Sequence, residues 1–111
     1  MNDLCKLSAV TARRLIGAGE LSPVTLLEAC IARIETVNQK VNAIVAKDYD
    51  RAIREATVAE KDVKKRKHLP PLHGIPVGIK DLNATKGMRT TWGSLLFKDH
   101  VPTEDEALVA R

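Results

Sequence analysis

Residues 72–79 form a largely apolar run that ends abruptly in two charged residues, Lys80 and Asp81. The apolar side chains fall on both alternating faces of an extended chain, a pattern typical of a strand covered on both sides in an α/β sheet. Pro76 removes one backbone donor from this strand and so argues against a central position in the sheet. The run therefore predicts a strand of an α/β fold, with Lys80 at its end.

Three helices are expected before this run, and serines cap the first two. Ser8 suits the N-cap of the first helix, which should stop near Gly17 and Gly19, since glycine tolerates the left-handed backbone common at helix ends. Ser22 is the expected N-cap of the second, with Pro23 at the first helical position. One face of this second helix is apolar at helical spacing and must be buried: Leu27, Cys30, Ile31, Ile34 and Val37.

A short strand and a third helix should follow. Residues 41–46 are apolar and short enough for a strand, and Asp48 or Asp50 then offers a helix cap. The stripe that this third helix should bury consists of Tyr49, Ala52, Ile53, Ala56, Ala59 and Val63. Its other faces are charged and are therefore expected to face solvent.

The C-terminal part is expected to begin with an irregular loop. Residues 83–94 are rich in Gly, Thr and Asn, with Trp92 as the expected anchor. Thr103 and Glu106 have the spacing of a capping box, and residues 107–110 would begin the helix. Because the chain ends within about two turns of this start, and isolated helices shorter than ~12–15 residues are marginal, we expect the sequence to be cut rather than finished.

The charge of the chain gives little support to a nucleic-acid partner. The 18 basic and 14 acidic residues leave a net charge of +4, which the cluster Lys64, Lys65, Arg66 and Lys67 accounts for by itself. Aromatic residues are few and do not alternate with this cluster, as a stacking platform for single strands would require. A basic helix end, favourable beside the negative end of the helix dipole, is the preferred interpretation; a basic nucleic-acid binder stays the alternative.

The sequence also indicates where such a protein works. No apolar run approaches the ~20 residues that span a bilayer, and the N-terminal residues lack the apolar stretch of a secretory signal. Cys5 and Cys30 show no metal-ligand spacing, so two reduced thiols are favoured over a disulfide. We therefore predict a cytoplasmic protein without a membrane partner.

Most familiar catalytic motifs are absent. The sequence has no phosphate-binding loop, no dinucleotide fingerprint, no H-E-x-x-H and no paired C-x-x-C. Its histidines (His68, His73, His100) are scattered, and its serines (Ser8, Ser22, Ser94) have no base beside them in sequence. Lys80 remains as a candidate. A solvated strand end is the plain interpretation, whereas a role as base would require burial to lower its pKa well below ~10.4.

A resemblance favours the catalytic interpretation of Lys80. The string Pro-Leu-His-Gly-Ile-Pro-Val-Gly-Ile-Lys-Asp at residues 71–81 resembles the N-terminal part of the amidase signature family. The similarity continues through Gly87, Thr90, Thr91, Gly93, Ser94 and residues 101–105, and it includes residues 21–24, 33–35 and 41–43 upstream. It therefore extends over nearly the whole chain.

The resemblance implies a fold and a chemistry. Family members form an α/β/α sandwich around a mixed sheet, of which this chain would hold the leading helices and one or two strands, as residues 1–111 of a single domain truncated before the catalytic serine motif. They use a Ser-cisSer-Lys triad to hydrolyse linear carboxamide bonds, with Lys80 as the lysine. Both serines belong to a Gly/Ser-rich stretch that this sequence lacks, and Ser94 matches a loop upstream of it rather than the nucleophile.

The partners follow from the same resemblance. It implies a small-molecule amide substrate, no metal or cofactor, the missing remainder of the amidase domain as a partner, and it allows a homodimer of the complete enzyme. The chain alone is then expected to be marginally folded and inactive. Two alternatives stay open: a protein similar to the glutamyl-tRNA amidotransferase A subunit, which would release ammonia from glutamine, and a non-catalytic relic or interaction module.

Overall fold

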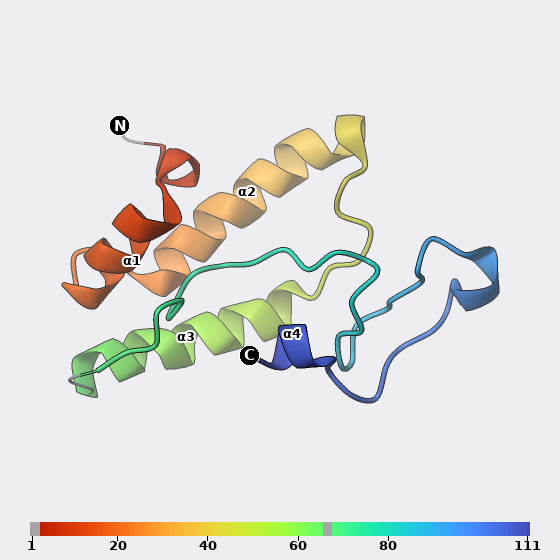
Figure 1. Cartoon of the computed structure of the whole chain (residues 1–111). Coiled ribbons are helices and arrows are strands. Elements are labelled where there is room, and N and C mark those ends of the chain that lie inside the picture. Colours follow the sequence, from red (N-terminus) through yellow and green to blue (C-terminus); the bar gives the residue numbers. More distant parts are fainter. Residues whose placement is uncertain (1–2, 66–67) are drawn as a thin grey trace. The chain divides into compact units, whose positions relative to one another are not determined.

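The computed structural model describes residues 3–65 and 68–111, and its regular elements are all helices (Figure 1). In chain order they are the 3-10 helix η1 (Leu4–Lys6), α1 (Ala9–Gly17), α2 (Pro23–Val41), α3 (Tyr49–Lys65), the 3-10 helix η2 (Leu95–Phe97) and α4 (Ala107–Ala110). The chain divides into two compact units. We call residues 1–41 with 49–76 the helical unit, and residues 42–48 with 77–111 the loop unit.

The predicted α/β fold is wrong, because neither expected strand is present in the described ranges. Residue 41 closes α2, residues 42–48 have no regular structure, and neither have residues 75–80. A strand is defined by hydrogen bonds to a neighbouring strand, and no such ladder forms among the described residues. The end of the apolar run is consequently not covered: Val77 is 75% and Ile79 42% exposed.

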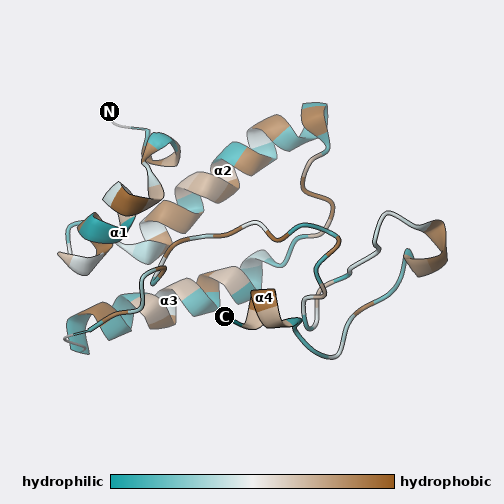
Figure 2. Ribbon diagram, viewed as in Figure 1, coloured by the Kyte–Doolittle hydropathy of each residue, from teal (hydrophilic) through white to brown (hydrophobic). Residues whose placement is uncertain are grey.

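The core of the helical unit lies around α1 and the start of α2. Its buried residues are Ala12 and Ile16 of α1, Leu21 before α2, and Leu26 within it. Partly buried side chains pack against this cluster from the rest of the unit: Leu4, Leu7, Leu15, Cys30, Val63 and Ile75. Apolar and polar residues alternate along α2 and α3 (Figure 2), and α2 contacts α3 and η1.

The predicted caps of the first two long helices are confirmed. The Ser8 hydroxyl accepts a hydrogen bond from the Thr11 N–H at 3.1 Å. The Ser22 hydroxyl accepts from the N–H groups of Val24 at 3.1 Å and Thr25 at 3.3 Å. Each bond satisfies a donor that the first turn of a helix leaves without an intrahelical partner.

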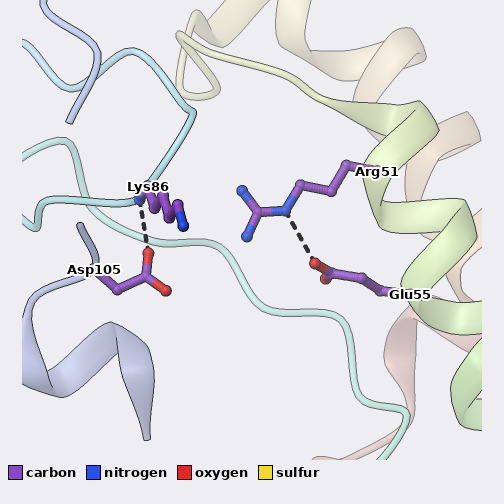
Figure 3. Close-up of polar contacts among 4 residues, drawn as sticks. All are labelled: Arg51, Glu55, Lys86 and Asp105. Carbon is purple, nitrogen blue, oxygen red and sulfur yellow. Dashed lines mark hydrogen bonds and ion pairs between the residues drawn. The ribbon is translucent and has the colours of Figure 1, made fainter. Parts of the chain in front are cut away.

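The third long helix is present, but the prediction that it buries an apolar stripe is wrong: none of its residues is buried, and Ile53 is 37% exposed. The helix begins at Tyr49, directly after Asp48, and ends with Lys64 and Lys65 in its last turn, as the helix-end interpretation of the basic cluster requires. Residues 66–67 of that cluster lie outside the described residues. An exposed pair joins Arg51 to Glu55 along α3 at 3.0 Å (Figure 3), a spacing that stabilises helices by only about 0.3–0.5 kcal/mol.

The segment after α3 is fastened to the helical unit by polar contacts. Arg13 of α1 donates from Nε to the Pro70 carbonyl at 3.0 Å and from Nη2 to the Leu69 carbonyl at 3.1 Å. His73 places Nε2 2.9 Å from the carbonyl oxygen of Ala59 in α3. These contacts hold the beginning of the apolar run although it belongs to no sheet.

Trp92 anchors the loop unit, as predicted. Its ring stacks on His100 with centroids 4.9 Å apart and meets Phe97 edge-on, also at 4.9 Å. Its indole N–H donates to the Leu82 carbonyl at 3.2 Å. The Thr90 N–H binds the His100 carbonyl at 2.9 Å, so two distant parts of the loop are joined around the aromatic rings.

The predicted capping box is wrong. The N-cap of α4 is Glu106 and not Thr103, and its side chain makes no cap hydrogen bond. Its carboxylate instead accepts hydrogen bonds from the Asn83 side-chain amide and, at 3.1 Å, from the Ala84 N–H. The neighbouring Asp105 accepts from the Lys86 N–H at 2.7 Å (Figure 3). The Glu106 carboxylate, which a capping box would use, thus binds loop residues about twenty positions upstream instead.

This difference makes a prediction about stability. Glu106→Ala should destabilise the loop unit by about 1–3 kcal/mol, because it leaves two donors of residues 83–84 without their partner. Thr103→Ala should change stability by less than about 0.5 kcal/mol, as is usual for an exposed position. Urea unfolding followed by fluorescence of Trp92, the single tryptophan, measures both. Equal losses of stability in the two variants would instead indicate that Thr103 and Glu106 form the predicted capping box.

Candidate active-site lysine

The Lys80 side chain is exposed, at the end of the irregular segment 75–80. Its backbone carbonyl accepts a hydrogen bond from the Asn83 N–H at 2.9 Å, which closes a turn directly after it. Within residues 3–65 and 68–111, its ammonium has no hydrogen-bond or ion-pair partner. The burial that a role as base would require is therefore not observed in this chain, because burial at a strand end requires a sheet and covering helices. Its catalytic role stays a prediction.

The residue after Lys80 makes the best-connected contacts of this region. Asp81 Oδ1 accepts a hydrogen bond from the Thr91 N–H at 2.8 Å, and its Oδ2 accepts one from the Thr91 hydroxyl. The Asp81 carbonyl accepts from the Trp92 N–H at 3.0 Å. We call this set of contacts the Asp81–Thr91 clasp. It closes the loop of residues 81–92 at its two ends.

The clasp also affects the charge of Asp81. The hydrogen bonds from the Thr91 hydroxyl and N–H lower the pKa of the Asp81 carboxyl, partial desolvation opposes them, and the positive charge of Arg89 adds to the lowering. Hydrogen bonds donated to a carboxylate favour its ionised form. The carboxylate is thus held negative in the folded chain.

A pH dependence follows from this lowered pKa. A carboxyl whose pKa is lower in the folded than in the unfolded state stabilises the fold above its unfolded pKa, about 3.9, and the contribution is lost as pH falls through the folded value. The stability difference between wild type and Asp81→Asn should therefore be largest near neutral pH and shrink below about pH 4. Urea unfolding followed by Trp92 fluorescence checks it, with Asp99→Asn, an exposed carboxylate of the same unit, as control. A pH-independent difference would contradict the assignment.

The other candidates from the sequence have structural roles or stand apart. Ser94 caps η2 by accepting a hydrogen bond from the Leu96 N–H at 3.2 Å. Among the described residues, no group of three or more His, Cys, Asp and Glu side chains could hold a metal ion. A hollow of about 320 Å³ in the loop unit is lined by residues 45–48 and 87–89 and does not include Lys80.

Sequence reasoning missed the polar residues that shape this region. Asp81 entered only as part of a motif, and Arg89 did not enter at all. Arg89 donates to the Val45 carbonyl at 2.5 Å and to the Lys98 carbonyl at 3.3 Å, which joins residues 42–48 to the rest of the loop unit. The available signal was an aspartate at the start of a Gly- and Thr-rich loop, since aspartate side chains often bind backbone N–H groups in turns.

No helix in residues 3–65 and 68–111 has both the length and the apolar character needed to cross a membrane.

Comparisons with known proteins agree with the resemblance found in the sequence. The family model described as Amidase matches residues 25–111, a range that includes Lys80 and the Asp81–Thr91 clasp. The glutamyl-tRNA(Gln) amidotransferase A subunit of Streptomyces coelicolor is 35% identical over 111 residues, which is 100% of this chain and 22% of the relative. An acylamidase of Rhodococcus erythropolis is 36% identical over 105 residues, which is 95% of this chain and 22% of the relative.

A third relative has the same relation to the chain. The glutamyl-tRNA(Gln) amidotransferase A subunit of Anaplasma phagocytophilum is 37% identical over 106 residues, covering 96% of this chain and 21% of the relative. The chain thus spans about a fifth of the length of the curated relatives it matches. Because the family model covers most of its residues, among them the lysine and the loop fastened behind it, the chain belongs to the amidase signature family.

Proposed function

We propose that this chain supplies the catalytic lysine, Lys80, of an amidase that hydrolyses linear carboxamide C–N bonds. The observation that carries the proposal is the family match over residues 25–111, which includes the whole segment around Lys80. The Lys80 side chain is exposed in this chain, so the burial that a base at this position requires would have to come from the remainder of the amidase domain.

In the proposed reaction, Lys80 in its neutral form accepts a proton through the bridging serine of the triad. The second serine then attacks the carboxamide carbon, and the amine or ammonia leaves with the proton that the lysine and bridging serine return to it. Water hydrolyses the acyl-enzyme by the same proton path and releases the acid. Both serines would come from a segment that this sequence lacks.

We propose further that residues 1–111 act as the N-terminal part of one amidase domain. Large apolar side chains of the loop unit are open to solvent, among them Leu95 at 87% and Leu96 at 90% exposure, as expected for a part that packs against the remainder of a larger fold. The complete protein would work in the cytoplasm on a small-molecule amide, as a monomer or as a homodimer. The chain by itself would be inactive.

The proposal is tested with a chimera. Residues 1–111 replace the matching N-terminal part of the Rhodococcus erythropolis acylamidase, and hydrolysis of a simple aliphatic or aromatic amide is measured by release of the amine. The chimera should be active and the chain alone inactive. A folded chimera without activity, together with cooperative unfolding of the chain alone as a monomer, would favour the non-catalytic module instead.

A glutaminase function is the second candidate. The match to the Streptomyces coelicolor amidotransferase protein covers all of this chain at 35% identity, so a chain of this kind could serve a subunit that releases ammonia from glutamine. A chimera with that subunit, assembled with the subunit's own partners, tests this function by ammonia release from glutamine. Activity in the acylamidase chimera alone would favour the amidase, and activity in the amidotransferase chimera alone would favour the glutaminase.

A further inference from the structure

We infer that Asp81 is a positioning residue for Lys80, because it fastens the chain directly after the lysine to the Thr91–Trp92 turn. The inference rests on the proposed function, in which Lys80 is the catalytic lysine. It assigns Asp81 no contact with substrate. Asp81 would act only through the backbone that it shares with Lys80.

Both oxygens of the Asp81 carboxylate are used on one residue. Oδ1 accepts from the Thr91 N–H at 2.8 Å, while Oδ2 accepts from the Thr91 hydroxyl. Two parallel bonds fix the orientation of a carboxylate plane, which one bond would leave free to rotate, and bonds to an ionised acceptor are stronger than neutral ones. The Asp81 side chain therefore fixes both its distance from Thr91 and its orientation relative to Thr91.

The backbone beyond Lys80 is held at three successive carbonyl groups. Those of Lys80, Asp81 and Leu82 accept, respectively, from the Asn83 N–H at 2.9 Å, the Trp92 N–H at 3.0 Å and the Trp92 indole N–H at 3.2 Å. Val77, Gly78 and Ile79, directly before the lysine, are all exposed. The direction in which the Lys80 side chain leaves the backbone thus depends on the anchorage that follows it.

The anchorage itself is connected to further contacts within the loop unit. Thr90 is 2% exposed, and its N–H binds the His100 carbonyl at 2.9 Å. The Trp92 ring rests on His100 and Phe97. Catalytic groups need such support from residues that are themselves fixed, because a misplacement of about 1 Å can cost about 10²-fold in rate.

Neutralisation of the Lys80 charge explains the contacts of Asp81 less well than positioning does. Among the described residues, no ion pair joins its carboxylate to the Lys80 ammonium, although the two residues are adjacent. Its hydrogen-bond partner is the neutral Thr91, and the cation that favours its ionised form is Arg89. The contacts therefore indicate a mechanical role rather than neutralisation of the lysine.

The activity test uses whichever chimera is active, the one with the acylamidase or the one with the amidotransferase protein, and four variants. Asp81→Ala should lower kcat by about 10²-fold and leave KM within about threefold, since substrate contacts are untouched. Thr91→Val, which keeps the N–H but loses the hydroxyl, should give a smaller loss, and Thr91→Ser should restore wild-type kcat. The double variant Asp81→Ala/Thr91→Val should be no slower than Asp81→Ala alone, because both act through one contact.

The same chimera gives a second readout that needs no activity. In amide hydrogen exchange, Asp81→Ala should reduce the protection of the Thr91 N–H by at least about tenfold, the factor that corresponds to a loss of about 1.4 kcal/mol. The Gly87 N–H, which binds the Pro102 carbonyl at 3.0 Å in the same unit, is the internal control and should keep its protection. Asp99→Ala should change neither amide.

The outcomes separate this inference from the function on which it rests. If Lys80→Ala leaves the chimera active, the proposed function fails. If Lys80→Ala abolishes turnover while Asp81→Ala, folded by circular dichroism and elution volume, keeps kcat within about threefold, only the positioning role fails. Should Asp81→Ala not fold, Thr91→Val decides: unchanged kcat in a folded protein overturns the role, and a loss reversed by Thr91→Ser supports it.

Discussion

Lys80→Ala in the acylamidase chimera is expected to lower kcat/KM for amide hydrolysis by about 10²- to 10⁴-fold. This is the range that a positioned proton-transfer group contributes to a reaction. The lysine is the only member of the proposed triad that this chain supplies, and without it the serine hydroxyl would have to attack at its ordinary, weak nucleophilicity. The measurement is the initial rate of amine release over a range of substrate concentrations.

Two further variants make this result specific. Lys80→Arg keeps the positive charge but removes the base, because a guanidinium does not lose its proton in proteins, so it should be nearly as inactive as Lys80→Ala. Lys98→Ala, at an exposed lysine of the same unit, should retain wild-type activity. A Lys80→Arg chimera with substantial turnover would show that charge, rather than proton transfer, is what position 80 contributes.

The parts of the fold that could be predicted from the sequence are those set by neighbouring residues. Ser8 and Ser22 each bind N–H groups within three residues of themselves, so a local pattern contains all that is needed. The predictions of a strand within residues 72–79 and of a capping box at Glu106 were wrong for the opposite reason. A strand depends on a pairing partner elsewhere in the chain. The Glu106 carboxylate binds residues 22 and 23 positions away. Neither kind of partner is visible in a local pattern.

The same distinction between local and distant contacts applies to the candidate site. Lys80 was found because it belongs to a distinctive run of residues, and the structure places it at the end of that run with its ammonium exposed. The Asp81–Thr91 clasp was not found, because its two side chains are ten positions apart and each is an ordinary loop residue by itself. A motif therefore located the reactive group, whereas the support around it required coordinates.

The largest expected effect on stability comes from the first glycine of the motif. Gly74 has a φ of +77°, and a Cβ added to it would lie 2.9 Å from Pro23 Cγ and 3.2 Å from Ile16 Cγ2. Both neighbours are fully buried, so neither can move away at low cost. Gly74→Ala should therefore combine backbone strain with overpacking and destabilise the helical unit by roughly 2–4 kcal/mol.

The effect is measured by urea unfolding of the chain, followed by far-ultraviolet circular dichroism, because α1, α2 and α3 all belong to the helical unit. Gly19→Ala is the matched control: its φ is +74°, but the added Cβ meets nothing within 4 Å, so it shows the strain without the overpacking. At Gly78 an added Cβ meets neither a strained backbone nor a close neighbour, so the stability of Gly78→Ala should stay within about 0.5 kcal/mol of that of wild type. If Gly74→Ala cost no more than Gly19→Ala, the motif would not pack against α1 and α2 as closely as the structure places it. A larger loss at Gly74 alone would show that this motif glycine is needed for packing on the helical unit, independently of any chemistry at Lys80.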